Sequence, residues 1–230
     1  MRENRRAPLK SIKASVRKEF DEMIRAISRA NLLYNEITQG KLMISGRPRG
    51  PRAPDSRNVA ELLFFGVASQ WESFCTSVFE LELKQRYRVH QRVALSIMSS
   101  VPVDADQPVE RFPISGYGNP YILTDRAEFL LSVRSPWVTF RNTLGNQSFQ
   151  YLVFRYRIRN YIAHAGAGKG GEDFKKVLNQ LHVPAAERVF MSAGRLLLDY
   201  PSGNPITERL FQLLLTNYQD VSRHVLDQSS

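Results

Sequence analysis

Apolar residues recur at helical spacing over most of this 230-residue chain, and few segments alternate with a period of two. Residues 9–39 and 58–92 each carry a long apolar stripe interrupted by charged positions. Clusters of proline and glycine separate these segments from the rest. We therefore predict an all-α fold, an antiparallel helical bundle of about five helices with one irregular insertion.

The chain length fits a single domain over residues 1–230. Within it, we expect a basic N-terminal tail at residues 1–8 and a basic loop at residues 45–57, where prolines, glycines and arginines alternate. Residues 93–124 contain four prolines and are predicted to form the irregular insertion. Asp125 is then expected to cap a helix.

Three further breaks are predicted near the C-terminal half. The Ser-Pro-Trp sequence at 135–137 should interrupt a helix, and the glycine-rich sequence 166–171 should form a flexible exit from the helix that begins near Gln147. Pro184 and Pro205 are expected to open the last two helices, the first of which should reach residue 199.

The positive charge is concentrated at one end of the chain. The formal net charge is +10, and residues 1–57 alone contribute +8. Arginines outnumber lysines by 24 to 8, and the planar guanidinium suits recognition of phosphates. This distribution favours RNA or another nucleic acid as partner; the alternative is a basic surface without a specific ligand.

Several classes of protein are not expected. No segment has 18 consecutive apolar residues, and the charged N-terminus lacks the apolar core of a signal peptide, so we expect no membrane contact. The one cysteine, Cys75, favours a reducing, cytoplasmic location. One cysteine and four scattered histidines give no spacing typical of a zinc site, and no metal or other cofactor is expected.

The predicted helix 147–165 is apolar on two opposite faces. Phe149, Leu152 and Val153 lie on one of them, and Phe154 and Ile158 lie on the other. A helix of this kind is buried on two sides. One side fits the core of the chain, whereas the other needs either more of the same chain or a second copy of it.

The same helix ends in the sequence Arg-Asn-Tyr-Ile-Ala-His, residues 159–164. Arg159 and His164 are five positions apart, so on a straight helix they point about 140° away from each other. Asn160 and His164 are four apart and face the same way. Either a loosened helix end or a symmetry mate would be needed to bring the arginine and the histidine together, and a homodimer would place two of each in one cleft.

Such a cleft has the groups needed to cut RNA without a metal ion. A histidine can transfer the proton of an attacking 2′-hydroxyl, and an arginine can stabilise the charge on the phosphate. Asparagine can orient either group. The glycine-rich sequence after His164 is not a phosphate-binding P-loop, because Gly170 follows Lys169 where that loop needs serine or threonine.

The sequence Arg-Asn-Tyr-Ile-Ala-His resembles the Arg-x(4–6)-His motif of HEPN domains, in which a polar residue follows the arginine. The sequence Ala-Ser-Gln-Trp-Glu-Ser-Phe at 68–74 resembles an earlier helix of the RiboL-PSP-like members, where a tryptophan–glutamate pair recurs. The order of the predicted helices is also similar, over about residues 10–92 and 125–227. Residues 93–124 depart from a minimal domain of this family.

The resemblance implies a dimeric helical domain that is often a metal-independent endoribonuclease in toxin–antitoxin systems, antiphage defence or RNA processing. On this basis Arg159 and His164 are the expected catalytic pair, Asn160 is their polar companion, and Glu72 supports the site. An antitoxin or regulatory protein is a further possible partner. We also expect Arg155, Arg157 and Lys169 to contact the substrate.

Simpler interpretations stay open for each of these residues. His164 could cap the helix end, where a cation is favourable. Arg155 and Arg157 could form a solvated flank, and Glu72 could be an ordinary surface carboxylate. For the whole protein, the alternative is a non-catalytic HEPN-like helical module that binds RNA or another protein.

Overall fold

The structure is a computed structural model, and it describes residues 9–39, 53–100, 117–131, 133–199 and 209–229. Every regular element in these ranges is a helix, which confirms the all-α class. They contain ten helices rather than about five: α1 (Leu9–Thr38), α2 (Ala53–Tyr87), α3 (Gln91–Ser100), α4 (Pro120–Leu130), α5 (Pro136–Thr143), α6 (Gly145–Ala163), α7 (Gly168–Gln180), α8 (Ala185–Arg188), α9 (Ala193–Asp199) and α10 (Leu210–Gln228).

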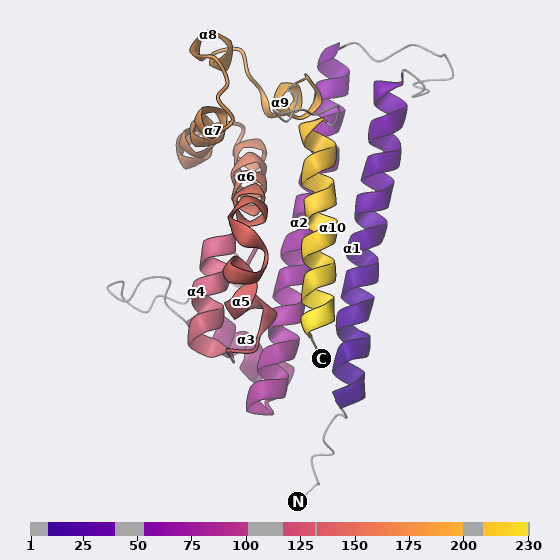
Figure 1. The fold of residues 1–230 in the computed structure, drawn as a ribbon, viewed down its shortest axis with the longest axis vertical. Helices are drawn as coiled ribbons and strands as arrows, with labels where there is room; N and C mark the ends of the chain where they lie inside the picture. Colours follow the sequence, from indigo (N-terminus) through magenta and orange to yellow (C-terminus); the bar gives the residue numbers. More distant parts are fainter. Residues whose placement is uncertain (1–8, 40–52, 101–116, 132, 200–208, 230) are drawn as a thin grey trace, which may run out of the picture.

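Four long helices position the rest of the chain. α2 packs against both α1 and α6, and α10 also packs against both of them. Figure 1 shows that the chain ascends in α1, descends in α2, ascends again in α6 and descends in α10, so the start of α1 and the end of α10 lie at the same end of the molecule. None of the described helices is both long and apolar enough to cross a lipid bilayer.

A cluster of aromatic rings forms the centre of the core. The ring of Trp71 on α2 lies 5.6 Å from that of Phe74, 6.4 Å from that of Trp137 on α5 and 5.3 Å from that of Tyr218 on α10. All four side chains are almost completely buried. The apolar face of α2 therefore packs against α5 and α10, and Glu72 follows Trp71 directly in the sequence.

The predicted loop and insertion are both shorter than expected. Residues 53–57 belong to the start of α2, where Pro54 and Asp55 suit a first helical turn because proline lacks an N–H and a carboxylate favours the positive end of the helix dipole. Residues 93–100 lie in α3 and residues 120–124 in α4. The predictions for residues 1–8, 45–52 and 101–116 concern parts of the chain outside the described residues.

The start of α4 also differs from the prediction. Its cap is Asn119, whose side chain accepts a hydrogen bond from the Tyr121 N–H at 3.1 Å, and Pro120 follows at the first position. Asp125 lies inside the helix and is not its cap. The break at 135–137 is confirmed, because Ser135 caps α5 by accepting from the Trp137 N–H at 3.3 Å.

The segment predicted as one helix over 184–199 is divided into α8 and α9. α9 starts against α2, where the side chain of Glu61 accepts a hydrogen bond from the Gly194 N–H at 2.6 Å. The last helix begins at Leu210, and Pro205 lies outside the described residues. In Figure 1, α7, α8 and α9 lie in the upper part of the molecule, together with the upper ends of α1 and α2.

The glycine-rich sequence 166–171 is a tight connection rather than a flexible exit. Ala165 and Gly166 have φ of 48° and 74°, and the Gly166 N–H donates to the carbonyl of Tyr161 at 2.9 Å, which closes the end of α6. α7 then begins at Gly168 and packs back on α6, with the ring of Phe174 stacked 4.1 Å from that of Tyr161. The end of α6 is thus held by its neighbour.

Candidate functional site

Arg159 is the centre of a small polar cluster at the end of α6. Its Nη2 donates to Oε2 of Glu72 on α2 at 3.0 Å. Its guanidinium carbon also lies 5.6 Å from the centre of the Phe65 ring. The two charged side chains are 27% and 25% exposed, so the ion pair is shielded from water on most sides but still reachable from solution.

Asn160 belongs to the same cluster. Its Oδ1 accepts a hydrogen bond from Nη1 of Arg159 at 3.2 Å. The structure therefore brings together Glu72, Arg159 and Asn160, three of the four residues predicted for the catalytic site. Glu72 and Asn160 fix the guanidinium from two sides, and a fixed cation is the arrangement that stabilises a phosphate without reorganisation.

His164 occupies the C-cap position of α6. Its backbone N–H donates to the carbonyl of Asn160 at 3.1 Å, and its side chain is exposed. In the part of the chain that the structure describes, no hydrogen bond or ion pair joins the imidazole of His164 to the side chain of Arg159 or Asn160. The helix end is thus not loosened enough to bring the histidine to the arginine within one chain.

The two apolar faces of α6 are both covered by the chain itself. Leu152 and Val153 on one face and Phe154 and Ile158 on the other are at most 6% exposed. α6 lies between α2 and α10 on one side and α7 on another. The second apolar face therefore needs no second copy, and the apolar faces of α6 give no argument for a dimer.

The buried position of Arg155 does not fit its predicted role in substrate binding. Its side chain is completely buried, with the guanidinium carbon 3.4 Å from the centre of the Tyr218 ring and 5.7 Å from that of Trp71. Its guanidinium donates to the carbonyls of Tyr151 and Leu214. Burial lowers the pKa of Arg155 to about 9, so it remains a cation at neutral pH inside the core.

The other two predicted substrate contacts lie at the surface. Nη1 of Arg157 donates to Oε1 of Gln180 at the end of α7, at 2.9 Å. Lys169 is exposed in the first turn of α7, five residues after His164. Both side chains are accessible, and among the described residues no hydrogen bond joins either of them to the cluster around Arg159.

Two residues near the cluster were not predicted. Phe65 precedes Glu72 by seven positions on α2, which is the spacing of two helical turns on one face, so the sequence did contain a signal for it. Gly118 lies against Glu72 from the start of α4, where an added Cβ would be 3.3 Å from the Cβ of Glu72. This close approach depends on tertiary packing and has no local signal.

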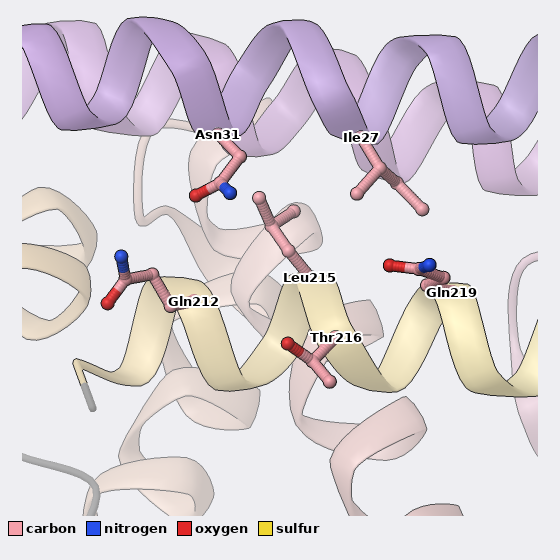
Figure 2. Close-up of a pocket in the computed structure, with 6 residues that line it drawn as sticks. All are labelled: Ile27, Asn31, Gln212, Leu215, Thr216 and Gln219. Carbon is pink, nitrogen blue, oxygen red and sulfur yellow. The ribbon is translucent and has the colours of Figure 1, made fainter. Parts of the chain in front are cut away.

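The pocket in Figure 2 lies elsewhere, in the groove between α1 and α10. Ile27 and Asn31 from α1 face Leu215 and the polar side chains Gln212, Thr216 and Gln219 from α10. It has a volume of about 190 Å³ and carries no charged side chain. It includes none of the predicted site residues.

Comparison with known proteins adds no assignment: no family model matches the chain, and neither a curated protein nor a solved structure matches it.

Proposed function

We propose that this protein is a HEPN-type, metal-independent endoribonuclease whose active site is completed by a second copy of the chain. In this proposal α1, α2, α6 and α10 form the antiparallel helical bundle of the family. The observation that carries the proposal is the cluster of Glu72, Arg159 and Asn160, with exposed His164 one turn further along α6.

The separation of Arg159 and His164 supports a shared site. Within one chain the guanidinium is held toward α2, and the imidazole lies at the exposed end of α6. A twofold axis next to this surface would bring the histidine of one copy to the arginine of the other. The second copy then supplies the histidine that the geometry of α6 keeps away from Arg159 within one chain.

The surface beside the cluster supports the same arrangement. Leu62 precedes Phe65 by three positions on α2 and is 69% exposed. Gly66 is also exposed and has no heavy atom within 4 Å of the position of an added Cβ. An exposed apolar side chain next to a flat stretch of helix suits contact with a second protein surface.

The reaction requires only proton transfer and charge stabilisation. The 2′-oxygen of the substrate attacks the adjacent phosphorus while His164 accepts the hydroxyl proton, and the bond from phosphorus to the 5′-oxygen breaks. Arg159 stabilises the additional negative charge on the phosphate. The leaving 5′-oxygen takes up a proton, so the products carry a 2′,3′-cyclic phosphate and a 5′-hydroxyl.

A cleavage assay with single-stranded RNA tests this proposal. We expect cutting in the presence of a chelator, with the two product ends given above, and loss of cutting in His164→Ala and in Arg159→Ala. His90→Ala is the matched control, because His90 is also an exposed histidine but lies between α2 and α3. Equal RNA binding without cutting by the wild-type protein would instead support the non-catalytic module.

Mixing the two inactive variants tests the shared site. If Arg159 and His164 come from different copies, an equal mixture of Arg159→Ala and His164→Ala forms heterodimers in which one site has both groups. About half of the dimers are mixed and each has one of its two sites intact, so about a quarter of the wild-type activity should return. No recovery between two folded, dimerising variants would contradict a site shared between copies.

A further inference from the structure

A second hollow lies at the other end of α2, where the start of α1 and the end of α10 meet the turn between α4 and α5. Its volume is about 310 Å³, which is within the range of small-molecule sites. Glu82 on α2 lines it, ten residues after Glu72. Ten helical residues span about 15 Å, so this hollow is separate from the cluster around Arg159.

Glu82 is incompletely paired within this hollow. Its Oε1 is buried and has no hydrogen-bond partner among the described residues. Burial raises the pKa of Glu82 to about 7, and a hydrogen bond with the Ser135 side chain opposes this shift. Arg86 is one turn further along α2, where an ion-pair partner is common, but its guanidinium lies over the ring of Tyr87 at 5.4 Å.

A buried carboxylate of this kind is best completed by a cation. A charged group removed from water is costly unless it is paired and hydrogen-bonded. An ammonium group from a ligand would supply both the opposite charge and the missing N–H donor. The first requirement on a ligand is therefore a positively charged nitrogen next to the carboxylate of Glu82.

The rim and the walls add two further requirements. Arg86 and Arg134 line the hollow and are exposed, and guanidinium groups bind carboxylates in a bidentate geometry. Val16, Leu131 and Pro136 give the hollow an apolar wall. A matching ligand carries an anionic group for the rim and a hydrocarbon body between its two charged ends.

We propose that this hollow binds a small zwitterion with an apolar side chain, an amino acid or a dipeptide. Its ammonium group donates to Glu82, its carboxylate accepts from Arg86 and Arg134, and its side chain packs against Val16 and Leu131. The site does not depend on the proposed nuclease activity, and either proposal can fail without the other.

Calorimetric titration of the full chain with four related probes tests this site. The probes are L-leucine, the dipeptide leucyl-leucine, 3-methylbutylamine and 4-methylpentanoate, and titration at about pH 8 keeps Glu82 ionised. We expect one of the two zwitterions to bind at least about tenfold more tightly than the amine and the acid, which each lack one charge. Whichever of L-leucine and leucyl-leucine binds more tightly shows whether the site takes a free amino acid or a dipeptide.

Variants then assign each charge of the ligand. Glu82→Gln should lower the affinity for the zwitterion about tenfold or more and leave the weak binding of 4-methylpentanoate unchanged. The double variant Arg86→Gln, Arg134→Gln should lower the affinity for both the zwitterion and 4-methylpentanoate. Glu80→Gln and Arg92→Gln are matched controls at nearby positions outside the hollow and should bind as the wild type does.

Three results would overturn the proposal. The first is that neither zwitterion binds at concentrations up to about 10 mM, which would detect even a dissociation constant of about 1 mM. The second is an amine that binds as tightly as the zwitterion, because the rim arginines would then have no role. The third is unchanged binding of the zwitterion by the Glu82→Gln variant, provided that the variant is folded, as shown by a thermal unfolding transition.

Discussion

Arg159 and Glu72 are separated by 87 residues in the sequence, and their side chains meet at 3.0 Å between Nη2 and Oε2. The contact joins α6 to α2 at the surface beside the buried ring of Trp71. Because both side chains are about a quarter exposed, water and salt screen the pair, and its contribution to stability is small. Its main effect is on the position of the guanidinium.

The first prediction concerns Glu72→Gln, which keeps the size of the side chain and removes its charge. If Glu72 positions Arg159 for the proposed reaction, the cleavage rate should fall about tenfold while the free energy of unfolding changes by less than about 1 kcal/mol. Glu80→Gln is the control, because it removes a similar ion pair with Lys84 on the same helix. A large loss of stability with unchanged cleavage would make Glu72 a structural residue.

The second prediction concerns the buried cation of Arg155. Arg155→Met retains an unbranched side chain between Trp71 and Tyr218, so its free energy of unfolding should stay within about 1.5 kcal/mol of the wild type. Arg155→Ala leaves a cavity and should lose about 2–4 kcal/mol. Urea unfolding measures both. RNA affinity should be unchanged in the methionine variant. A clear loss of RNA affinity would instead support the prediction that Arg155 contacts the substrate.

The sequence predicts the helices that have a continuous apolar stripe. Residues 9–39 and the region of Trp71 are helical because apolar side chains recur on one face, and Ser135 and Pro136 mark a helix start by their own chemistry. α7 was missed because its first turn contains three glycines, which have low helix propensity. The stacking of Phe174 on Tyr161 stabilises it from outside.

The candidate site could be predicted only in part, because some of its features depend on tertiary contacts that leave no local pattern in the sequence. Arg159 and Asn160 are adjacent in the sequence, but the partners of Arg155 lie on α2 and α10, and no local pattern brings them together. From spacing alone, Arg155 and Arg159 are equivalent arginines one turn apart. Burial by Trp71 and Tyr218 is a tertiary property that makes one a core residue and leaves the other at the surface.

The third prediction compares two glycines. Gly166 has a φ of 74°, and an added Cβ would lie 2.9 Å from Cε2 of Tyr161, so Gly166→Ala should lose about 1–3 kcal/mol. Gly66 lies inside α2 with open space around it, and Gly66→Ala should gain up to about 1 kcal/mol from helix propensity. Thermal unfolding distinguishes the two. Similar shifts for both would mean that the end of α6 does not depend on Gly166.

The fourth prediction tests the surface proposed to contact the second copy. Leu62→Asp places a charge on an exposed apolar position three residues before Phe65, whose ring contacts Arg159, and should weaken dimerisation and cleavage together. Val189→Asp is the control, since Val189 is 81% exposed but lies between α8 and α9. Analytical ultracentrifugation measures the first effect. A Leu62→Asp protein that still forms an active dimer would place the interface elsewhere.

The fifth prediction concerns the pH dependence that Glu82 gives to stability. Burial raises the pKa of Glu82 from its ordinary value of 4.5 to about 7 in the folded protein. Well below pH 4.5 the group is protonated in both states and has no effect on the free energy of unfolding. As the pH rises toward 7 the unfolded chain ionises first, so Glu82 makes the free energy of unfolding fall, by at most about 3 kcal/mol.

Glu82→Gln removes this titration and gives the matched comparison. The variant should unfold at about the same urea concentration as the wild type near pH 4 and at a higher concentration near pH 8, since other groups titrate equally in both proteins. The difference should develop between these two values and level off above the folded-state pKa. A constant difference across this range would mean that Glu82 ionises as readily in the folded chain as in the unfolded one, and that its carboxylate already has the partner that the hollow lacks.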